Sequence, residues 1–194
     1  MEKSIEIIAG PNGSGKTTFA ESIFLRNGRG GQVFFVNPDV IASGISPSNA
    51  ERAAFQAGRV MLRTIQGFIA SSESFAFEST LSGKTWLPMM EGALSDGYEI
   101  TIYFPYLDAV QRNIERIRTR VRQGGHSIPA QTVRRRYPRS FRNFWNVYRP
   151  LCAKWFVLDN SKSRPLLVCS SATFSGFSAA EKAAFEKRFL KGKA

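Results

Sequence analysis

Cysteine is scarce in this 194-residue chain, and long apolar runs are missing from it. The two cysteines, Cys152 and Cys169, are too few for a disulfide scaffold and lack the spacing of metal ligands, so we expect both to be small apolar residues. No apolar run approaches ~18 residues, and no signal-peptide pattern begins the sequence. We therefore expect a soluble, cytoplasmic protein that neither spans a membrane nor is exported by a signal peptide.

Acidic residues are also few, since 15 Asp and Glu stand against 27 Lys and Arg and leave a formal net charge of +12. Most of this excess lies between Arg112 and Arg149, where eleven arginines accompany a single acid, Glu115. Clustered arginine predicts anionic partners, namely nucleotide phosphates, a sugar diphosphate or a nucleic-acid backbone. The alternative is a solvated basic face without a partner.

The strongest motif lies near the N-terminus. A predicted strand over 5–9 runs into residues 10–18, which fit the phosphate-binding pattern G-x-x-x-x-G-K-[ST]. Glycine permits the positive φ that turns several N–H groups toward one triphosphate. We expect Lys16 to reach the β- and γ-phosphates of ATP and the Thr17 hydroxyl to ligate Mg²⁺. The expected nucleotide contacts are Gly10, Pro11, Asn12, Gly13, Ser14, Gly15, Lys16, Thr17 and Thr18.

Two acids follow predicted strands, Asp39 after a buried strand over 33–36 and Glu78 after a strand over 74–77. Because the carboxyl ends of parallel strands share one sheet edge, both acids are expected beside the phosphate loop. Asp39 is then placed to act on an attacking hydroxyl or on the metal. As alternatives, Asp39 caps the following helix and Glu78 pairs with a local arginine.

Apolar periodicity predicts the remaining elements. Helices are expected over 50–70, 85–95 and about 179–190, and strands over 98–104 and 155–158. The turn over 159–161 is expected near the base of a bound nucleotide. We therefore expect an α/β protein in which residues 1–194 form a single domain.

The arginine-rich stretch over about 108–140 is predicted to form a lid. Asp108 is expected to cap a helix that carries arginine on both sides of its buried seam, and a second basic helix is expected to break at Pro138. Glycines at 124–125 would act as the hinge. A lid that closes over a triphosphate brings arginines to the transferred phosphoryl group. His126 is either a phosphate donor or a plain loop residue.

With these residues in view, the chain resembles the zeta-toxin family of P-loop kinases, in particular its short single-domain members. The resemblance covers about residues 5–161. It rests on five segments in order, GPNGSGKTT (10–18), FVNPD (35–39), FESTLSG (77–83), RVRQGGH (120–126) and LDNS (158–161). The resemblance implies a three-layer P-loop kinase fold with a five-stranded parallel sheet and an arginine-rich helical lid.

The resemblance also implies chemistry. ATP with Mg²⁺ would be the phosphoryl donor, and a UDP-N-acetylamino sugar would be phosphorylated on a sugar hydroxyl. Toxins of this family stall cell-wall synthesis in that way and are held inactive by an antitoxin, which implies an antitoxin partner.

On this match Asp39 falls on the catalytic base, Lys16 and Thr17 on the phosphate and metal ligands, and Glu78 and Thr80 on the substrate-side motif. Arg116 matches one phosphate-clamping lid arginine, and the second clamp is His126, Arg120 or Arg135. The expected catalytic residues are Asp39, Lys16, Arg116 and Arg120. The expected acceptor contacts are Asn37, Glu78, Ser79, Thr80, His126 and Arg135.

We therefore predict an ATP-dependent kinase that acts on a hydroxyl of a small anionic acceptor. Two alternatives stay open. One is a polynucleotide or nucleoside kinase, because the basic lid suits a nucleic-acid end. The other is a nucleotide-dependent binding protein without enzymatic activity, whose basic face grips nucleic acid or an acidic partner.

Overall fold

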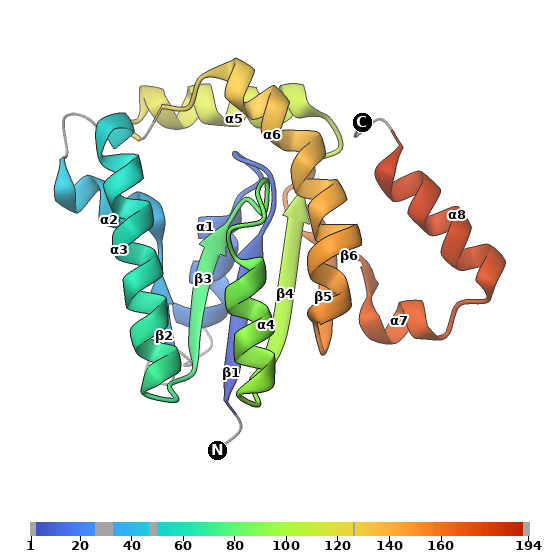
Figure 1. The fold of residues 1–194 in the computed structure, drawn as a ribbon. Helices are drawn as coiled ribbons and strands as arrows, with labels where there is room; N and C mark the ends of the chain where they lie inside the picture. The colour runs from blue at the N-terminus through green and yellow to red at the C-terminus, as the bar shows by residue number, and fades with distance from the viewer. Residues whose placement is uncertain (1–2, 26–32, 47–49, 126, 192–194) are drawn as a thin grey trace.

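The computed structural model describes residues 3–25, 33–46, 50–125 and 127–191. A central sheet lies between helices in three layers (Figure 1). In the described part of the chain its strands follow the order β2-β3-β1-β4-β5-β6. The strands are β1 (Ser4–Ala9), β2 (Phe34–Val36), β3 (Phe75–Ser79), β4 (Glu99–Tyr106), β5 (Lys154–Asp159) and β6 (Leu166–Ser170).

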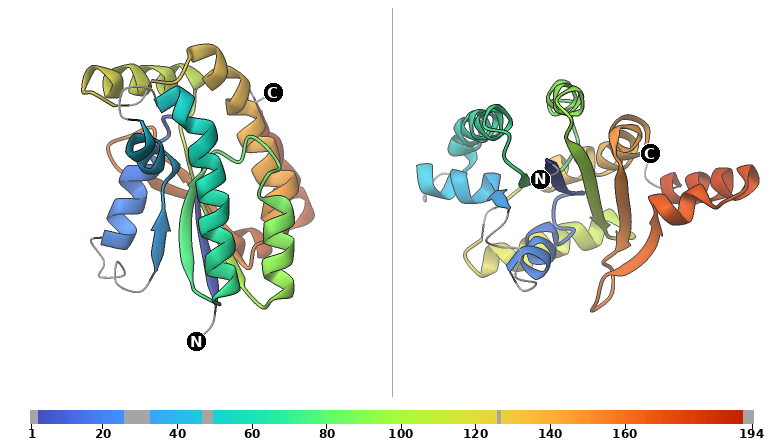
Figure 2. Two further views of the ribbon diagram at one scale, coloured as in Figure 1. Left: turned by 60° about the vertical axis from the view of Figure 1, so that its left-hand side comes forward. Right: turned by 90° about the horizontal axis from the view of Figure 1, so that it is seen from below.

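The helices occupy both faces of the sheet and its carboxyl edge. They are α1 (Lys16–Ala20), α2 (Pro38–Ile45), α3 (Ala50–Ala70), α4 (Leu87–Ser95), α5 (Val110–Arg122), α6 (Ala130–Asn143), α7 (Ser171–Ser175) and α8 (Ala179–Leu190). Helices α3, α4 and α6 cover one face and α1 the other, while α5 crosses the carboxyl edge (Figures 1 and 2). The long helix and the C-terminal helix expected from periodicity are confirmed by α3 and α8. None of the described helices combines the length and apolar character that crossing a bilayer requires.

Strand β1 lies between two parallel neighbours, and this arrangement positions the site. Ile8 pairs with Glu78 of β3 on one side and with Tyr103 of β4 on the other. The backbone N–H of Gly10 donates to the Ser79 carbonyl at 3.1 Å, so β3 and the segment after β1 leave the sheet together. The residues that follow these two strands therefore meet at one edge, where open α/β sheets bind their ligands.

The core lies on both faces of β1, as a near-continuous apolar strand requires. Ile5 and Ile7 are fully buried in the larger cluster, which includes side chains of α3, α4 and α6. Ile8 faces a smaller cluster with Ala20 and Phe24 beneath α1. Burial on both faces fixes β1 and so fixes the starting point of the loop that follows it.

Aromatic rings attach the C-terminal helix to the body. Phe104 of β4 stacks on Phe144 with ring centroids 4.3 Å apart, and Phe144 belongs to a π-helical turn, Phe144–Tyr148, that continues α6. Phe185 and Phe189 of α8 are buried against Trp145 in the same cluster. The C-terminal helix thus packs on the body of the protein through these rings.

The predicted sheet of five parallel strands is wrong by one strand. The sixth, β6, pairs with β5 in antiparallel orientation and carries exposed leucines, Leu166 and Leu167. An antiparallel neighbour needs only a short connection, so no crossover helix announces it in the sequence. The strand over 33–36, expected to be buried, is instead the edge strand β2, with Phe34 52% exposed and Phe35 39% exposed.

Two helix boundaries in the arginine-rich stretch also differ from expectation. Helix α6 runs through Pro138 without a break. A proline removes one helical hydrogen bond, and the burial of Tyr137 and Phe141 on the same face offsets that loss. Ala109, and not Asp108, is the N-cap of α5, and Asp108 instead forms an ion pair with Arg112 at 3.2 Å.

Candidate active site

The loop after β1 has the backbone of a phosphate cradle. Gly10, Gly13 and Gly15 have φ values of 145°, 77° and 90°, which L side chains rarely adopt. The neighbours also leave no room for side chains, since a Cβ on Gly13 would lie 2.6 Å from the Asn113 carbonyl oxygen. The glycine spacing therefore serves both the turn of this loop and its close packing.

Two distant asparagines hold this loop from outside. Asn113 of α5 is fully buried, and its Nδ2 donates to the Asn12 carbonyl at 2.7 Å. Asn160, just after β5, donates to the Ser14 carbonyl at 2.8 Å. The sequence analysis missed both roles, although a polar residue on the apolar side of α5 was a usable signal for Asn113.

Lys16 begins α1 and folds back over the mouth of the loop. Its Nζ donates to the Gly10 carbonyl at 3.0 Å and to the Pro11 carbonyl at 3.1 Å. Burial lowers the pKa of the Lys16 ammonium below its usual range, and the nearby Glu78 and Asp39 carboxylates oppose this shift. The ammonium thus lies where an anion would gain from its charge.

Glu78 connects the loop with the segment after β2. It is only 6% exposed, and it accepts hydrogen bonds from the Thr17 hydroxyl at 3.2 Å and from Asn37 Nδ2 at 3.0 Å. Burial raises the pKa of the Glu78 carboxyl, while the Lys16 charge works against that rise. Its partners are a hydroxyl and an amide, so the alternative of pairing with an arginine is wrong.

Asp39 lies in the first turn of α2, but it does not cap that helix. Asn37 is the N-cap, and its Oδ1 accepts from the N–H groups of Asp39 at 2.8 Å and Val40 at 3.4 Å. The Asp39 carboxylate is about half exposed and lies 3.7 Å from Arg120 Nη1 of α5. The capping alternative for Asp39 is therefore wrong, and its carboxylate faces the lid.

A cavity of about 270 Å³ brings most of the predicted residues together. Its walls include Asn12, Gly13, Gly15, Lys16, Thr17, Thr18, Asp39, Glu78, Ser79, Thr80, Arg116 and Arg120. Gly10, Pro11 and Ser14 shape the loop behind this wall, and Asn37 is buried beneath it. Phosphate-binding amides, a lysine, two carboxylates and two arginines thus share one space.

No family model matches the chain. Over 138 residues it is 33% identical to an uncharacterized protein of Haemophilus influenzae, an alignment that covers 71% of this chain and 94% of that one. The two chains belong to one family.

Solved structures identify the fold. A chain of the AvrRxo1-ORF1:ORF2 complex with ATP superposes with a TM-score of 0.74 at 16% identity, over 97% of this chain and 64% of that chain. The present chain therefore spans about two thirds of that neighbour. A chain of the PezAT chromosomal toxin–antitoxin system of Streptococcus pneumoniae gives a TM-score of 0.62 at 12% identity, over 99% and 87% of the two chains. The chain therefore shares its fold with these two proteins.

The arginines expected near the phosphates differ in their positions. Arg116 Nη2 donates to the Asn160 carbonyl at 2.8 Å, and its Nη1 would lie 3.6 Å from a Cβ on Gly15, so its guanidinium borders the loop. Arg135 is exposed on α6 and is absent from the cavity wall. His126 lies outside the described residues.

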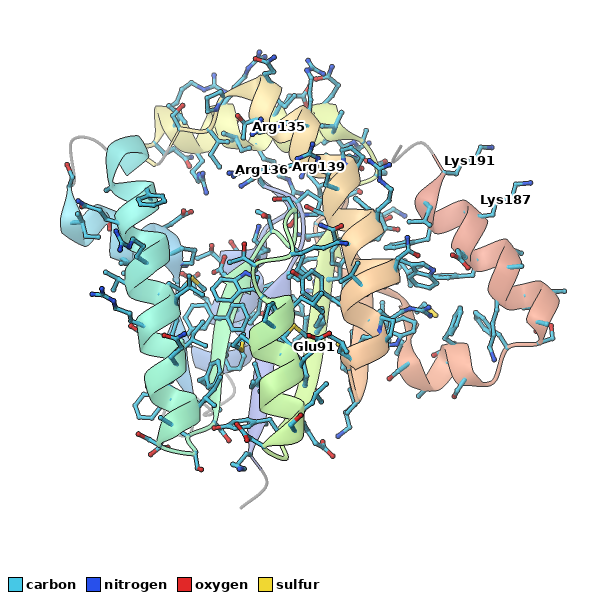
Figure 3. The ribbon with its side chains drawn as sticks, in the orientation of Figure 1. Glu91, Arg135, Arg136, Arg139, Lys187 and Lys191 are labelled. Atoms are coloured by element: carbon cyan, nitrogen blue, oxygen red, sulfur yellow. The ribbon has the colours of Figure 1, made fainter. Side chains whose placement is uncertain are left out.

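Arg136 is a candidate that the sequence analysis did not single out. Burial lowers the pKa of its guanidinium, and its charge also acts on Lys16. Figure 3 shows Arg135, Arg136 and Arg139 on α6 above the carboxyl edge of the sheet. The buried residues Val133 and Tyr137 fix the phase of α6, and that phase could have distinguished Arg136 from Arg135.

The donor atoms around Thr17 fit a magnesium ion. Mg²⁺ prefers oxygen ligands and is usually held by one or two carboxylates together with substrate phosphates and water. The Thr17 hydroxyl and the Glu78 carboxylate beside it supply such oxygens in the cavity wall. These are the residues that would hold the ion next to a triphosphate on the loop.

Proposed function

We propose that the protein is an ATP-dependent kinase that transfers the γ-phosphoryl group of ATP to a hydroxyl of a small anionic acceptor. One observation carries the proposal. The wall of the 270 Å³ cavity includes residues of the phosphate loop together with Asp39, Arg116 and Arg120. A phosphoryl donor and a base that can activate a hydroxyl would therefore lie in the same space.

The loop, Lys16 and Thr17 form the donor half of this kinase. The inward amides and the N-terminus of α1 favour the negative charge of a triphosphate, and Lys16 can exchange its two carbonyl partners for phosphate oxygens. Thr17 and Glu78 would hold Mg²⁺, which when bound neutralises charge on the phosphates.

Asp39 and the arginines form the transfer half. Asp39 accepts the proton of the attacking hydroxyl, and the guanidinium groups of Arg116 and Arg120 stabilise charge on the phosphoryl group in transfer. Arg120 lies 3.7 Å from Asp39, so a modest rotation of either side chain would let Arg120 exchange Asp39 for another anionic group. We assign residues 108–140 to a lid of one kinase domain that spans residues 1–194.

For the acceptor we favour a cytoplasmic UDP-N-acetylamino sugar. Glu78, Ser79 and Thr80 of the cavity wall would contact it, while Asn37, predicted as a further contact, lies buried beneath them and holds Glu78 in place. This assignment rests on the resemblance to zeta toxins and on the similarity in fold to a chain of a toxin–antitoxin system. The same similarity supports an antitoxin as a protein partner.

Replacement of Asp39 by asparagine tests the proposal, because the variant keeps the shape of the side chain and loses its basicity. We expect kcat for transfer from labelled ATP to UDP-N-acetylglucosamine to fall by about 10²- to 10⁴-fold, the usual contribution of a general base. Calorimetry should show ATP binding unchanged. Glu91→Gln, which alters an exposed acid on α4, is the matched control. Full turnover by Asp39→Asn would refute the assignment.

The arginines exposed on α5 and α6 favour a second candidate, a kinase for nucleic-acid ends. Parallel incubations with an oligonucleotide and with UDP-N-acetylglucosamine show which acceptor gains the label. If the chain is instead a binding protein without enzymatic activity, its binding to nucleic acid or to an acidic partner should depend steeply on salt and should survive Asp39→Asn. No phosphorylated product should form in that case.

A further inference from the structure

We call the cavity of about 270 Å³ beside the phosphate loop the transfer cavity. A second hollow lies next to it, between the loop that follows β3 and helix α6. Its volume is about 410 Å³. Its lining includes Gly83, Lys84, Arg139, Arg142, Asn143 and Asn146, and no carboxylate is among the residues of its wall. We call this set the basic hollow. Three cations from two different elements, without a counter-charge in the wall, concentrate anions at this place.

The backbone that forms one side of the basic hollow is held in a fixed shape. Leu81 is buried at a φ of 49°, a conformation that an L residue keeps only when its surroundings hold it. Two side chains hold this loop, one from α6 and one from the π-helical turn that continues α6. Asn143 donates to the Leu81 carbonyl at 2.8 Å, and the buried Tyr148 donates to the Gly83 carbonyl at 2.8 Å. Lys84 therefore projects from a braced loop.

The wall of the basic hollow adjoins the wall of the transfer cavity. Thr80 lines the cavity, Ser82 lines the hollow, and their hydroxyl oxygens are 2.9 Å apart. On the other side, α6 carries Arg136, whose charge acts on Lys16, and then Arg139 and Arg142 three and six residues later. At a rise of about 1.5 Å per residue these positions lie about 5 and 9 Å farther along the helix.

We propose that the basic hollow binds a phosphate or diphosphate of the acceptor while the acceptor hydroxyl faces Asp39. This inference rests on the proposed function and adds the acceptor's second anchoring point. The ligand chemistry is a phosphate ester on an extended molecule, because the cations lie beyond the transfer cavity. A sugar nucleotide and a nucleic-acid strand both carry such a group.

The test is a binding titration in which the donor site is already filled. Wild-type protein saturated with Mg²⁺ and a non-hydrolysable ATP analogue is titrated with UDP-N-acetylglucosamine by calorimetry and with a fluorescent twelve-residue oligothymidylate by anisotropy. We expect Arg139→Ala/Arg142→Ala to weaken one of the two probes by about ten- to hundredfold, the range of one or two charge-assisted contacts. Lys84→Ala, on the other element, should weaken the same probe by about tenfold.

The matched control removes the same charge elsewhere. Arg118→Ala/Arg134→Ala alters exposed residues of α5 and α6 that are absent from the wall of the basic hollow, and we expect less than about a threefold effect. The proposal is overturned if the control weakens binding as strongly as the Arg139/Arg142 variant, if that variant changes neither probe, or if the wild type binds neither probe.

The probe that responds identifies the source of the phosphate group. A loss confined to UDP-N-acetylglucosamine assigns the hollow to a sugar nucleotide, and a loss confined to the oligonucleotide assigns it to a nucleic-acid strand. If the ATP analogue itself does not bind, the proposed function fails instead, and the same titrations without the analogue still test the hollow.

Discussion

Removal of the Asn113 side chain should weaken both the fold and the nucleotide site. Asn113 is fully buried, and its Nδ2 donates a hydrogen bond to the carbonyl of Asn12 in the phosphate loop. Asn113→Ala leaves that carbonyl without its donor, and an unpaired buried acceptor costs about 1–3 kcal/mol. For a chain of this size each kcal/mol lowers Tm by about 2–4 °C, so we expect a loss of roughly 2–12 °C.

Nucleotide binding should also weaken in Asn113→Ala, because a loop that has lost this contact must be ordered when the phosphates bind. We expect the affinity for a non-hydrolysable ATP analogue with Mg²⁺ to fall by about tenfold, which corresponds to a free-energy cost of about 1.4 kcal/mol for ordering the loop. Thermal denaturation and calorimetry measure the two effects. Gln111→Ala, an exposed amide on the same helix, is the control. If Asn113→Ala matches Gln111→Ala in both assays, the loop does not depend on this contact and the reasoning fails.

Two further substitutions test the same site. Gly13→Ala places a Cβ 2.6 Å from the Asn113 carbonyl oxygen at a φ of 77°, so ATP-analogue binding should be lost in calorimetry, whereas Gly97→Ala, with φ 81° and open space around it, should keep normal affinity. Because burial raises the pKa of Glu78, its carboxyl should take up a proton at a higher pH than an exposed glutamate. The folded protein then binds this proton more readily than the unfolded protein does, so the contribution of Glu78 to the free energy of unfolding becomes more favourable as the pH falls through its raised folded-state pKa. Over the same pH range the Mg²⁺-dependent affinity for ATP should decline, because the protonated carboxyl no longer ligates the ion. Glu78→Gln should abolish this pH dependence, and an unchanged pH profile would contradict the assignment.

The parts predicted well from sequence are those encoded locally. The phosphate loop depends on glycines within a few residues of Lys16, and β1 depends on a short, mostly apolar run that only Glu6 interrupts, so both can be predicted from short stretches of sequence. The placement of Asp39 and Glu78 at one sheet edge needed only the rule that parallel strands end together.

The parts that could not be predicted depend on packing between distant segments. Asn113 and Asn160 contact loop residues 101 and 146 positions away, and no local pattern marks such pairs. Helix α6 passes through Pro138 because tertiary burial outweighs local preference. Arg136 is partly buried and Arg135 is exposed, a distinction of one residue in helical phase that only the packed structure resolves.

The anchoring of the phosphate loop also limits how the motif can be transplanted. Its glycines, lysine and threonine lie within the first twenty residues, yet two of its carbonyls are satisfied from helix α5 and from the end of β5. A fragment that stops before residue 110 would contain every residue of the motif and lack both of those hydrogen-bond donors. The proposed nucleotide binding would therefore depend on the assembled chain, and insertions or domain fusions that displace either asparagine would impair it without changing the motif.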